Sequence, residues 1–499
     1  MRVLADHVFP ARRCARGVAV IVALFTGGLS ATAQGPAAGP DPDAITVSGS
    51  LRSRLESSDW FGDDRNGAYS FAGSLLRLAL AQSRPRADWQ VELAIPILVG
   101  LPDHASAPGA QGALGLGATY FAANDGRDNV SSIFAKQAFL RVRRLGGVEG
   151  QSLKIGRMEF VDGAEVVPRD ATLATLKRDR IAHRLLGTFG FSHVGRSLDG
   201  AQYGLDRRGV NVTALAARPT QGVFQVEGWG ELNVTVMYGA MTGQTSGRAQ
   251  MGEWRLFGLR YADDRKGAVK TDNRPLDVRR LETDPIATGT FGGHSLHAAK
   301  TAAGTIDLLA WGAFQNGSWG VLDHRAGAFS TEAGWQPSVW PAMRPWFRGG
   351  VGYGSGDSDP ADTVHGTFFQ ILPTPRVYAR FPFFNMMNLR DAFGEVRLRS
   401  SRALTLRGDI HALRLVRTRD LWYQGGGAFQ PSTFGYAGRP SNGHSDLATL
   451  YDVSGDIAVN PQVSIGAYGS YASGKMVTQS IYDGARGALF GYVELLLRF

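Results

Sequence analysis

Apolar and polar residues alternate with a period of two along most of this chain. In the first such segment, Ile45, Val47 and Leu51 share one face, whereas Arg52 and Arg54 lie on the other. This alternation predicts β-strands with one apolar and one polar face. Eighteen segments follow the pattern. They cover residues 44–56, 70–82, 87–97, 133–144, 152–158, 199–205, 208–217, 229–240, 254–263, 293–301, 304–313, 325–334, 343–353, 392–400, 403–412, 449–459, 462–472 and 488–499.

The connections between the predicted strands are alternately short and long. Short connections lie at 83–86, 206–207, 302–303, 401–402 and 460–461. Long connections cover 98–132, 159–198, 264–292, 354–391 and 413–448. Short periplasmic turns and long extracellular loops are typical of bacterial outer-membrane barrels. The chain is therefore predicted to be all-β, with residues 44–499 forming one antiparallel transmembrane β-barrel of about eighteen strands.

One connection does not fit this order. Residues 241–253 form a long connection where the alternation predicts a short turn. They are either a periplasmic tongue or the sign of a misplaced strand. The C-terminal strand fits well, because Val493, Leu495, Leu497 and Phe499 share a face and the chain ends in an aromatic residue. Such a strand is expected to close the barrel, which leaves no free edge for lipid to solvate.

The first 33 residues have the pattern of a secretory signal peptide. Basic residues precede the short apolar stretch from Gly17 to Leu29, and Ala31-Thr32-Ala33 is a small-x-small cleavage site before Gln34. Residues 34–43 read as a flexible Pro/Gly/Ala linker. The only cysteine, Cys14, lies inside the predicted signal peptide, so the mature chain is expected to contain no disulfide and no thiolate metal site.

Composition agrees with a membrane barrel, although a soluble β-sandwich shares some of its signs. The chain is 43% hydrophobic and contains 65 glycines. After Gln34, no apolar run reaches the length of about 18 residues that a transmembrane helix requires. The formal net charge is +9. For a secreted chain, this charge indicates an anionic membrane surface or an anionic substrate and not nucleic acid.

Arginines occur at the polar phase of several predicted strands. A mid-membrane arginine on the lipid face costs about 2–4 kcal/mol, so these side chains are expected to face the lumen. The candidates are Arg52, Arg54, Arg141, Arg143, Arg348, Arg397, Arg399 and Arg407. A ring of guanidinium groups selects anions and pairs with carboxylates. Alternatively, the arginines are neutralised by lumen acids such as Glu92, Asp409 or Glu494.

The sequence offers little for catalysis or cofactor binding. Asp357, Asp359 and Asp362 lie close together and could bind Ca²⁺ through carboxylate oxygens, but the Asp-Pro turn between them explains the same residues without metal. His294 and His297 have no third ligand nearby, and no nucleophile elbow is found. No cofactor is therefore expected apart from this calcium candidate, and the chain is not expected to be an enzyme.

Three short motifs resemble those of the alginate export porin family. They are Gly156-Arg157-Met158-Glu159-Phe160, then Arg196-Ser197-Leu198-Asp199-Gly200, and then Ser355-Gly356-Asp357-Ser358-Asp359-Pro360 followed by Gly366-Thr367-Phe368. The resemblance covers about Ile45 to Phe499. It implies an eighteen-stranded outer-membrane barrel with an arginine-rich lumen that passes an acidic polysaccharide and with loops that partly occlude the pore. The basic, aromatic segment from Leu372 to Asn388 is unlike an alginate exporter.

Together these features predict an outer-membrane channel for an anionic substrate, such as an exported acidic exopolysaccharide like alginate. The alternatives are a general small-anion porin, or a non-conducting barrel with an enzymatic or adhesive loop surface. Expected partners are outer-membrane lipid and lipopolysaccharide, the transported anion or polysaccharide, and periplasmic secretion proteins. If the pore is plugged, the loops 98–132 and 354–391 are the candidate plugs.

Overall fold

The computed structural model describes residues 44–61, 67–247, 249–401, 403–482 and 486–499. The predicted signal peptide, 1–33, and the predicted linker, 34–43, lie outside the described residues. Residues 45–499 form one compact unit.

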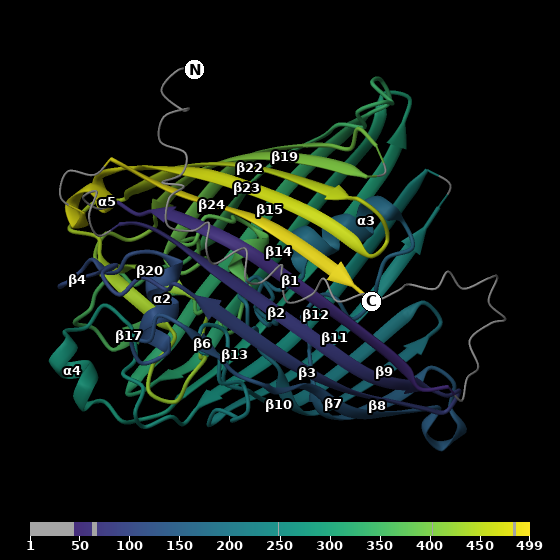
Figure 1. The fold of residues 1–499 in the computed structure, drawn as a ribbon, viewed down its shortest axis with the longest axis horizontal. Helices are drawn as coiled ribbons and strands as arrows, with labels where there is room; N and C mark the ends of the chain where they lie inside the picture. Colours follow the sequence, from purple (N-terminus) through teal and green to yellow (C-terminus); the bar gives the residue numbers. More distant parts are fainter. Residues whose placement is uncertain (1–43, 62–66, 248, 402, 483–485) are drawn as a thin grey trace. The chain divides into compact units, whose positions relative to one another are not determined.

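Eighteen long antiparallel strands form a closed barrel, as the alternation predicts. Each pairs with its neighbour along the chain, and β24 pairs with β1 from Ser50↔Arg498 to Asp59↔Leu489, so the sheet closes on itself. Figure 1 shows the tilted strands side by side, with the yellow β24 beside the purple β1. The strands are β1 (Thr46–Asp59), β2 (Ala68–Ser83), β3 (Ala87–Val99), β7 (Phe134–Arg143), β8 (Gln151–Met158), β9 (Leu198–Arg207), β10 (Val210–Pro219), β11 (Val234–Ser246), β12 (Gln250–Asp263), β13 (Ile286–Thr301), β14 (Gly304–Trp319), β15 (Leu322–Pro337), β16 (Trp346–Gly354), β18 (Leu389–Leu398), β19 (Leu404–Leu415), β22 (Asp446–Ala458), β23 (Val463–Gly474) and β24 (Gly487–Arg498).

Side chains on these strands alternate between a polar interior and an apolar exterior. In β15, Ser330 and Glu332 are buried inside the barrel, whereas Phe329 and Trp335 are exposed on its outer wall. This arrangement is the reverse of a soluble protein and is the one that suits a barrel surrounded by lipid. The alternation therefore determines which residues can reach the lumen.

All eighteen predicted strands overlap an observed strand, but some boundaries were wrong. The strands β11 and β12 continue to Ser246 and from Gln250, so a short turn replaces the connection predicted at 241–253. There is no periplasmic tongue at this place. The strand β13 begins at Ile286 and not at residue 293. Its first half is rich in glycine and threonine, which weakens the hydrophobic alternation that marks a strand.

The two rims of the barrel differ in the length of their connections. Turns at 84–86, 208–209, 247–249, 302–303 and 459–462 are short, and long loops at 100–133, 159–197, 264–285, 355–388 and 416–445 lie at the other rim. The loops and turns carry β4 (Ser106–Ala107), β5 (Gly112–Ala113), α2 (Leu116–Ala123), β6 (Val130–Ser131), η1 (Leu145–Gly147), α3 (Ala171–Leu176), η2 (Lys177–Ile181), α4 (Leu276–Leu281), β17 (Val364–His365), η3 (Pro375–Val377), β20 (Leu421–Gly425), β21 (Tyr436–Pro440) and α5 (Met476–Ile481). In the described part of the chain, every helix is too short or too polar to cross a membrane.

Two long loops, 159–197 and 355–388, fold into the lumen and are called the inner loops below. They pair through a parallel bridge between Leu186 and Leu372, and the amide of Leu372 donates to the carbonyl of Leu185 at 2.8 Å. Inward-facing side chains of the wall bind them from several sides. Arg180 of the first loop pairs with Glu332 of β15, and Gln315 of β14 donates to the carbonyl of Phe369 in the second. The inner loops therefore fill the middle of the barrel.

Candidate functional site

A cavity of about 830 Å³ lies between the inner loops and the rim of short turns, and it is called the vestibule below. Arg344 and Arg399 belong to the connections after β15 and β18 at that rim, and Thr405 is the second residue of β19. At the opposite end, His183, Thr374 and their neighbours on the inner loops form the floor. Since short turns face the periplasm in barrels of this kind, the vestibule is the periplasmic half of the lumen.

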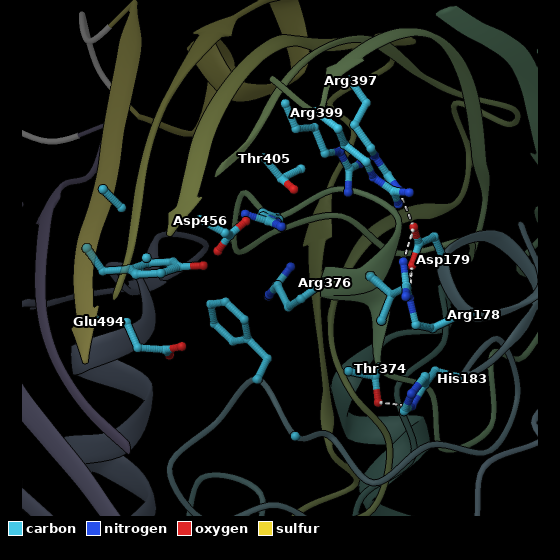
Figure 2. Close-up of a pocket in the computed structure, with 18 of the residues that line it drawn as sticks. Arg178, Asp179, His183, Thr374, Arg376, Arg397, Arg399, Thr405, Asp456 and Glu494 are labelled. Carbon is cyan, nitrogen blue, oxygen red and sulfur yellow. Dashed lines mark hydrogen bonds and ion pairs between the residues drawn. The ribbon is translucent and has the colours of Figure 1, made fainter. Parts of the chain in front are cut away.

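The vestibule is strongly basic. Seven arginines line it, against three carboxylates. The arginines are Arg178, Arg344, Arg376, Arg380, Arg397, Arg399 and Arg407, and the carboxylates are those of Asp179, Asp456 and Glu494. Figure 2 shows Arg376, Arg397 and Arg399 facing one open space, with Asp456 and Glu494 on its other side. The excess of positive charge makes this space attractive to anions.

Three of these arginines have no acidic partner. No carboxylate of the described residues lies within 4.0 Å of the guanidinium of Arg344, Arg380 or Arg399. Burial and the nearby charges of Arg397 and Arg178 lower the pKa of Arg399. These guanidinium groups are therefore available to an anion that enters the vestibule.

Arg376 reaches the vestibule from the second inner loop. One of its terminal nitrogens donates to the carbonyl of Phe381 at 2.9 Å, and burial lowers its pKa to about 10. At neutral pH this side chain keeps its charge. Its Nε is buried and has no hydrogen-bond partner in the structure.

Other charges of the vestibule are compensated and hold the loop in place. Arg397 pairs with Asp179 of the first inner loop at 2.7 Å and with Glu395 at 3.0 Å. Arg407 pairs with Glu395 at 3.2 Å and with Asp409 at 2.9 Å. Burial raises the pKa of the Asp179 carboxyl, but the hydrogen bonds and charges of Arg178 and Arg397 outweigh burial and lower that pKa to about 2. Asp179 is therefore ionised throughout the physiological range.

The eight arginines that the alternation along the predicted strands places in the lumen have different surroundings. Three of them, Arg397, Arg399 and Arg407, line the vestibule. Arg348 is buried against Asp307 and Glu332, with Nη2 at 2.8 Å from Glu332. Arg141 pairs with Asp88 at 2.7 Å, and Arg143 pairs with the same carboxylate at 2.9 Å. These pairs correspond to the neutralised alternative.

The two arginines of β1 hold an inner loop. Arg52 donates from Nη1 to the carbonyl of Gly190 at 2.5 Å and also binds the carbonyl of Ser192. Arg54 pairs with Glu494 at 2.6 Å and donates to the carbonyl of Phe191 at 3.1 Å. Their guanidinium groups point inward, but they bind the chain itself.

The alternation of inward and outward side chains along strands could not reveal four of the vestibule arginines. Arg178, Arg344, Arg376 and Arg380 lie on loops or turns, where side-chain direction follows no period. The basic composition of Leu372 to Asn388 was the only signal for two of them.

The family-like motifs contain residues that fasten the inner loops. Arg196 is buried and donates to four carbonyls, those of Gly187 at 3.2 Å, Leu372 at 3.0 Å, Gly426 at 2.7 Å and Ala428 at 3.1 Å. These carbonyls belong to both inner loops and to the loop 416–445. Arg196 therefore joins three loops at one point, a role that its sequence position alone did not indicate.

The acids proposed as calcium ligands bind backbone amides. Asp357 accepts from the amides of Asp359 at 3.0 Å and Gly366 at 3.3 Å, and Asp362 accepts from that of Val364 at 2.7 Å. Within the described ranges, no group of three histidine, cysteine, aspartate or glutamate side chains is placed to hold a metal ion. The structure therefore does not assemble Asp357, Asp359 and Asp362 into a calcium site, because their oxygens are directed to the turns.

Comparison with known proteins identifies the architecture. The family model described as "Alginate export" matches residues 45–481. OpdK of Pseudomonas aeruginosa, solved with vanillate, superimposes with a TM-score of 0.54 and 8% identity over 91% of this chain and 98% of that chain. OccK2 (OpdF) of the same species, solved with glucuronate, gives a TM-score of 0.53 and 9% identity over 91% and 96%.

A BenF-like porin from Pseudomonas fluorescens Pf-5 gives a TM-score of 0.55 and 10% identity over 91% of this chain and 98% of that chain. At such identities the likeness concerns the fold, which is that of outer-membrane porins. No curated protein sequence matches the chain.

Proposed function

This chain belongs to the alginate export family of outer-membrane β-barrels, and from that premise we propose that it is an anion-selective channel whose substrate carries uronate-type carboxylates. The uncompensated arginines of the vestibule carry this proposal. Arg344, Arg380 and Arg399 present guanidinium groups to a space of about 830 Å³ without an acidic partner within 4.0 Å among the described residues. Guanidinium binds carboxylate in a bidentate, charge-assisted manner, which suits a sugar acid.

The mechanism follows from the position of these charges. The positive potential of the vestibule concentrates anions at the periplasmic end of the lumen, and low-dielectric walls strengthen the attraction. Several guanidinium groups within one cavity allow a carboxylate to exchange partners without leaving. Conduction requires that an anion binds favourably enough to enter but weakly enough to leave, which several binding sites in one pore allow. The cluster of arginines provides several such sites. No covalent step is part of this role.

Two sizes of substrate share this chemistry. The family description favours an acidic polysaccharide such as alginate as the substrate. The volume of the vestibule, about 830 Å³, lies in the range of about 300–1,000 Å³ that is typical of small-molecule sites. The packed inner loops beyond it favour a single sugar acid or a short oligomer in this conformation. A polymer would require the inner loops to move apart, so small uronates are the second candidate.

Current block in planar bilayers tests the proposal. Glucuronate added on the periplasmic side is expected to interrupt the chloride current of the wild type, whereas uncharged glucose is not. The variant Arg344→Gln/Arg380→Gln/Arg399→Gln should lose most of the glucuronate block. Arg218→Gln, which removes an exposed arginine paired with Glu231 outside the vestibule, is the matched control. Equal block by glucose and glucuronate would contradict the proposal.

The same current recordings distinguish a polymeric substrate from a small uronate. If the substrate is a polymer, oligomeric uronate should block at lower concentration and for longer than the monomer, because several carboxylates bind at once. If the substrate is a small uronate, the monomer should cross the channel and oligomers should be excluded. Either result retains the uronate chemistry and decides between the two candidates.

A further inference from the structure

A groove of about 510 Å³ lies on the outer wall of the barrel, separate from the lumen, and is called the outer groove below. It crosses four neighbouring strands, β15, β16, β18 and β19. Four of its residues form one cross-strand row, because Phe329 pairs with Tyr353, Tyr353 with Arg390, and Arg390 with Arg414. Two aromatic side chains thus stand directly beside two arginines.

The residues of the outer groove face away from the lumen. Phe329 is 45% exposed and Val351 37% exposed, whereas Ser330 and Gly354, at the opposite phase of the same two strands, are buried. The rings of Phe329 and Tyr353 are stacked with centroids 5.3 Å apart. In the outer membrane these side chains contact lipid, and they offer an apolar surface on which an acyl chain can pack.

The two arginines lie at the long-loop end of this surface. Arg390 is the second residue of β18, and Arg414 is the last but one of β19, so both are close to the rim of long loops. That rim faces the cell exterior in barrels of this type. The arginines are therefore near the headgroups of the outer leaflet, whereas Phe329 and Val351 lie further along the strands.

The protein balances the charge of only one of the two arginines of the outer groove. Arg414 pairs with Asp446 at 2.8 Å, and both side chains are about half exposed. Arg390 has no carboxylate of the described chain within 4.0 Å. An outward arginine beside lipid is unfavourable unless an anionic group of the membrane receives its charge. Here the chemistry required is a phosphate or carboxylate attached to an acyl chain.

We propose that the outer groove is a lipopolysaccharide-binding site. A phosphate of the lipid A head would accept hydrogen bonds from Arg390 and Arg414, and an acyl chain would lie over Phe329, Val351 and Tyr353. The outer leaflet of a Gram-negative outer membrane supplies this combination of phosphorylated sugar and saturated chains. Guanidinium is well suited to phosphate because its donors match two phosphate oxygens at once. This inference is independent of what passes through the lumen.

Binding of purified lipid A to the detergent-solubilised barrel tests the proposal. Native mass spectrometry with bisphosphorylated, hexa-acylated lipid A would measure the affinity of the wild type and of Arg390→Gln/Arg414→Gln. The double variant is expected to bind at least about tenfold more weakly, since two charge-assisted hydrogen-bonding groups are lost. The control is Arg260→Gln, which removes an outward-facing arginine near the same end of β12 and outside the groove. Its affinity should match that of the wild type.

Two further measurements keep the result interpretable. Val351→Trp leaves both arginines in place but fills the groove, and it should also weaken binding if an acyl chain lies there. Dephosphorylated lipid A should bind the wild type as weakly as intact lipid A binds the double variant. Unchanged affinity in folded, heat-modifiable Arg390→Gln/Arg414→Gln would overturn the proposal. Equal affinity for phosphatidylglycerol would do so as well, because the site would then be a general anionic-lipid contact.

Discussion

At the scale of single residues, arginine has three different roles in this barrel. Arg399 and Arg380 are free to meet an anion, Arg348 is enclosed by acids of the wall, and Arg196 binds only backbone carbonyls. The residue type is the same, and the neighbours decide the role. A count of lumen arginines therefore overstates the number available to a substrate.

Arg196 gives a testable consequence of the third role. Burial lowers the pKa of Arg196 to about 10, so it remains charged and donates to carbonyls of three loops. Arg196→Gln should loosen these loops by about 2–4 kcal/mol, because charge-assisted hydrogen bonds to buried carbonyls are lost. The expected result is a larger and noisier single-channel conductance. Arg196→Lys, which keeps the charge but cannot reach four carbonyls, should show an intermediate effect. Wild-type conductance in both variants would argue against the tether.

Strand phase placed some of these residues and could not place others. Arg397, Arg399 and Arg407 were expected in the lumen because alternation fixes the side of the wall on which a strand residue lies. The same rule does not tell whether a partner is present. The acids that neutralise Arg348 are Glu332 on the neighbouring strand and Asp307 on the strand beyond it, and the pairing and register of these strands bring the three side chains together.

At the scale of elements, the first inner loop is held to the wall by ion pairs. Asp179 pairs with Arg397 of β18, Arg180 with Glu332 of β15, and Lys177 with Glu253 of β12 at 2.7 Å. These contacts come from three separated strands, so they fix the position of the loop across the lumen. Breaking a buried pair leaves an uncompensated charge, which makes each of them a strong restraint.

The pair of Asp179 makes the loop sensitive to acid. The pKa of Asp179 is lowered to about 2, below the usual value near 4, so the folded loop favours the ionised carboxyl. Its stabilisation, about 2 kcal/mol, is fully present above about pH 4 and is lost as the pH falls through about 2. Channel noise should therefore be constant from pH 7 to about 4 and increase below that range. Asp179→Asn should be noisy already at pH 7. If its noise at pH 7 equals that of the wild type, the pair does not restrain the loop.

The inner loops also mark the limit of sequence-based prediction for elements. The loops 98–132 and 354–391 were the candidate plugs because they are long. The second does enter the lumen, but residues 159–197, and not 98–132, form the other part of the vestibule floor. Length alone cannot tell which of the long loops reach the vestibule. The ion pairs that hold the first inner loop in the lumen join residues up to 218 positions apart in the sequence.

At the scale of the whole molecule, the eighteen strands were predictable because lipid demands an apolar exterior and closure demands paired edges. The strand boundaries within 241–253 and before residue 293 were not predictable, because glycine and threonine obscure the alternation of apolar and polar residues. Closure depends on the pairing of β1 with β24. The amide of Gly49 donates to the carbonyl of Phe499 at 2.7 Å, and the amide of Phe499 donates back at 3.0 Å.

The C-terminal residue should therefore be required for assembly. The side chain of Phe499 is 65% exposed on the barrel surface, so a charge there faces lipid near the periplasmic interface. Phe499→Asp should reduce the amount of heat-modifiable barrel in the outer membrane several-fold. Val459→Asp places the same charge on an exposed apolar position of a short turn and serves as the control. Equal assembly of the two variants would contradict the closing role of Phe499.

Ion selectivity tests the central claim most directly. In planar bilayers under a KCl gradient, the reversal potential of the wild type should have the sign that indicates preference for Cl⁻ over K⁺. The preference should weaken as the salt concentration rises, because ions screen the arginines of the vestibule. Arg344→Gln/Arg380→Gln/Arg399→Gln should move the potential toward zero, and Arg325→Gln, on the outer wall beside Asp323, should not. A cation-selective wild type, or a triple variant with the wild-type reversal potential, would contradict the account.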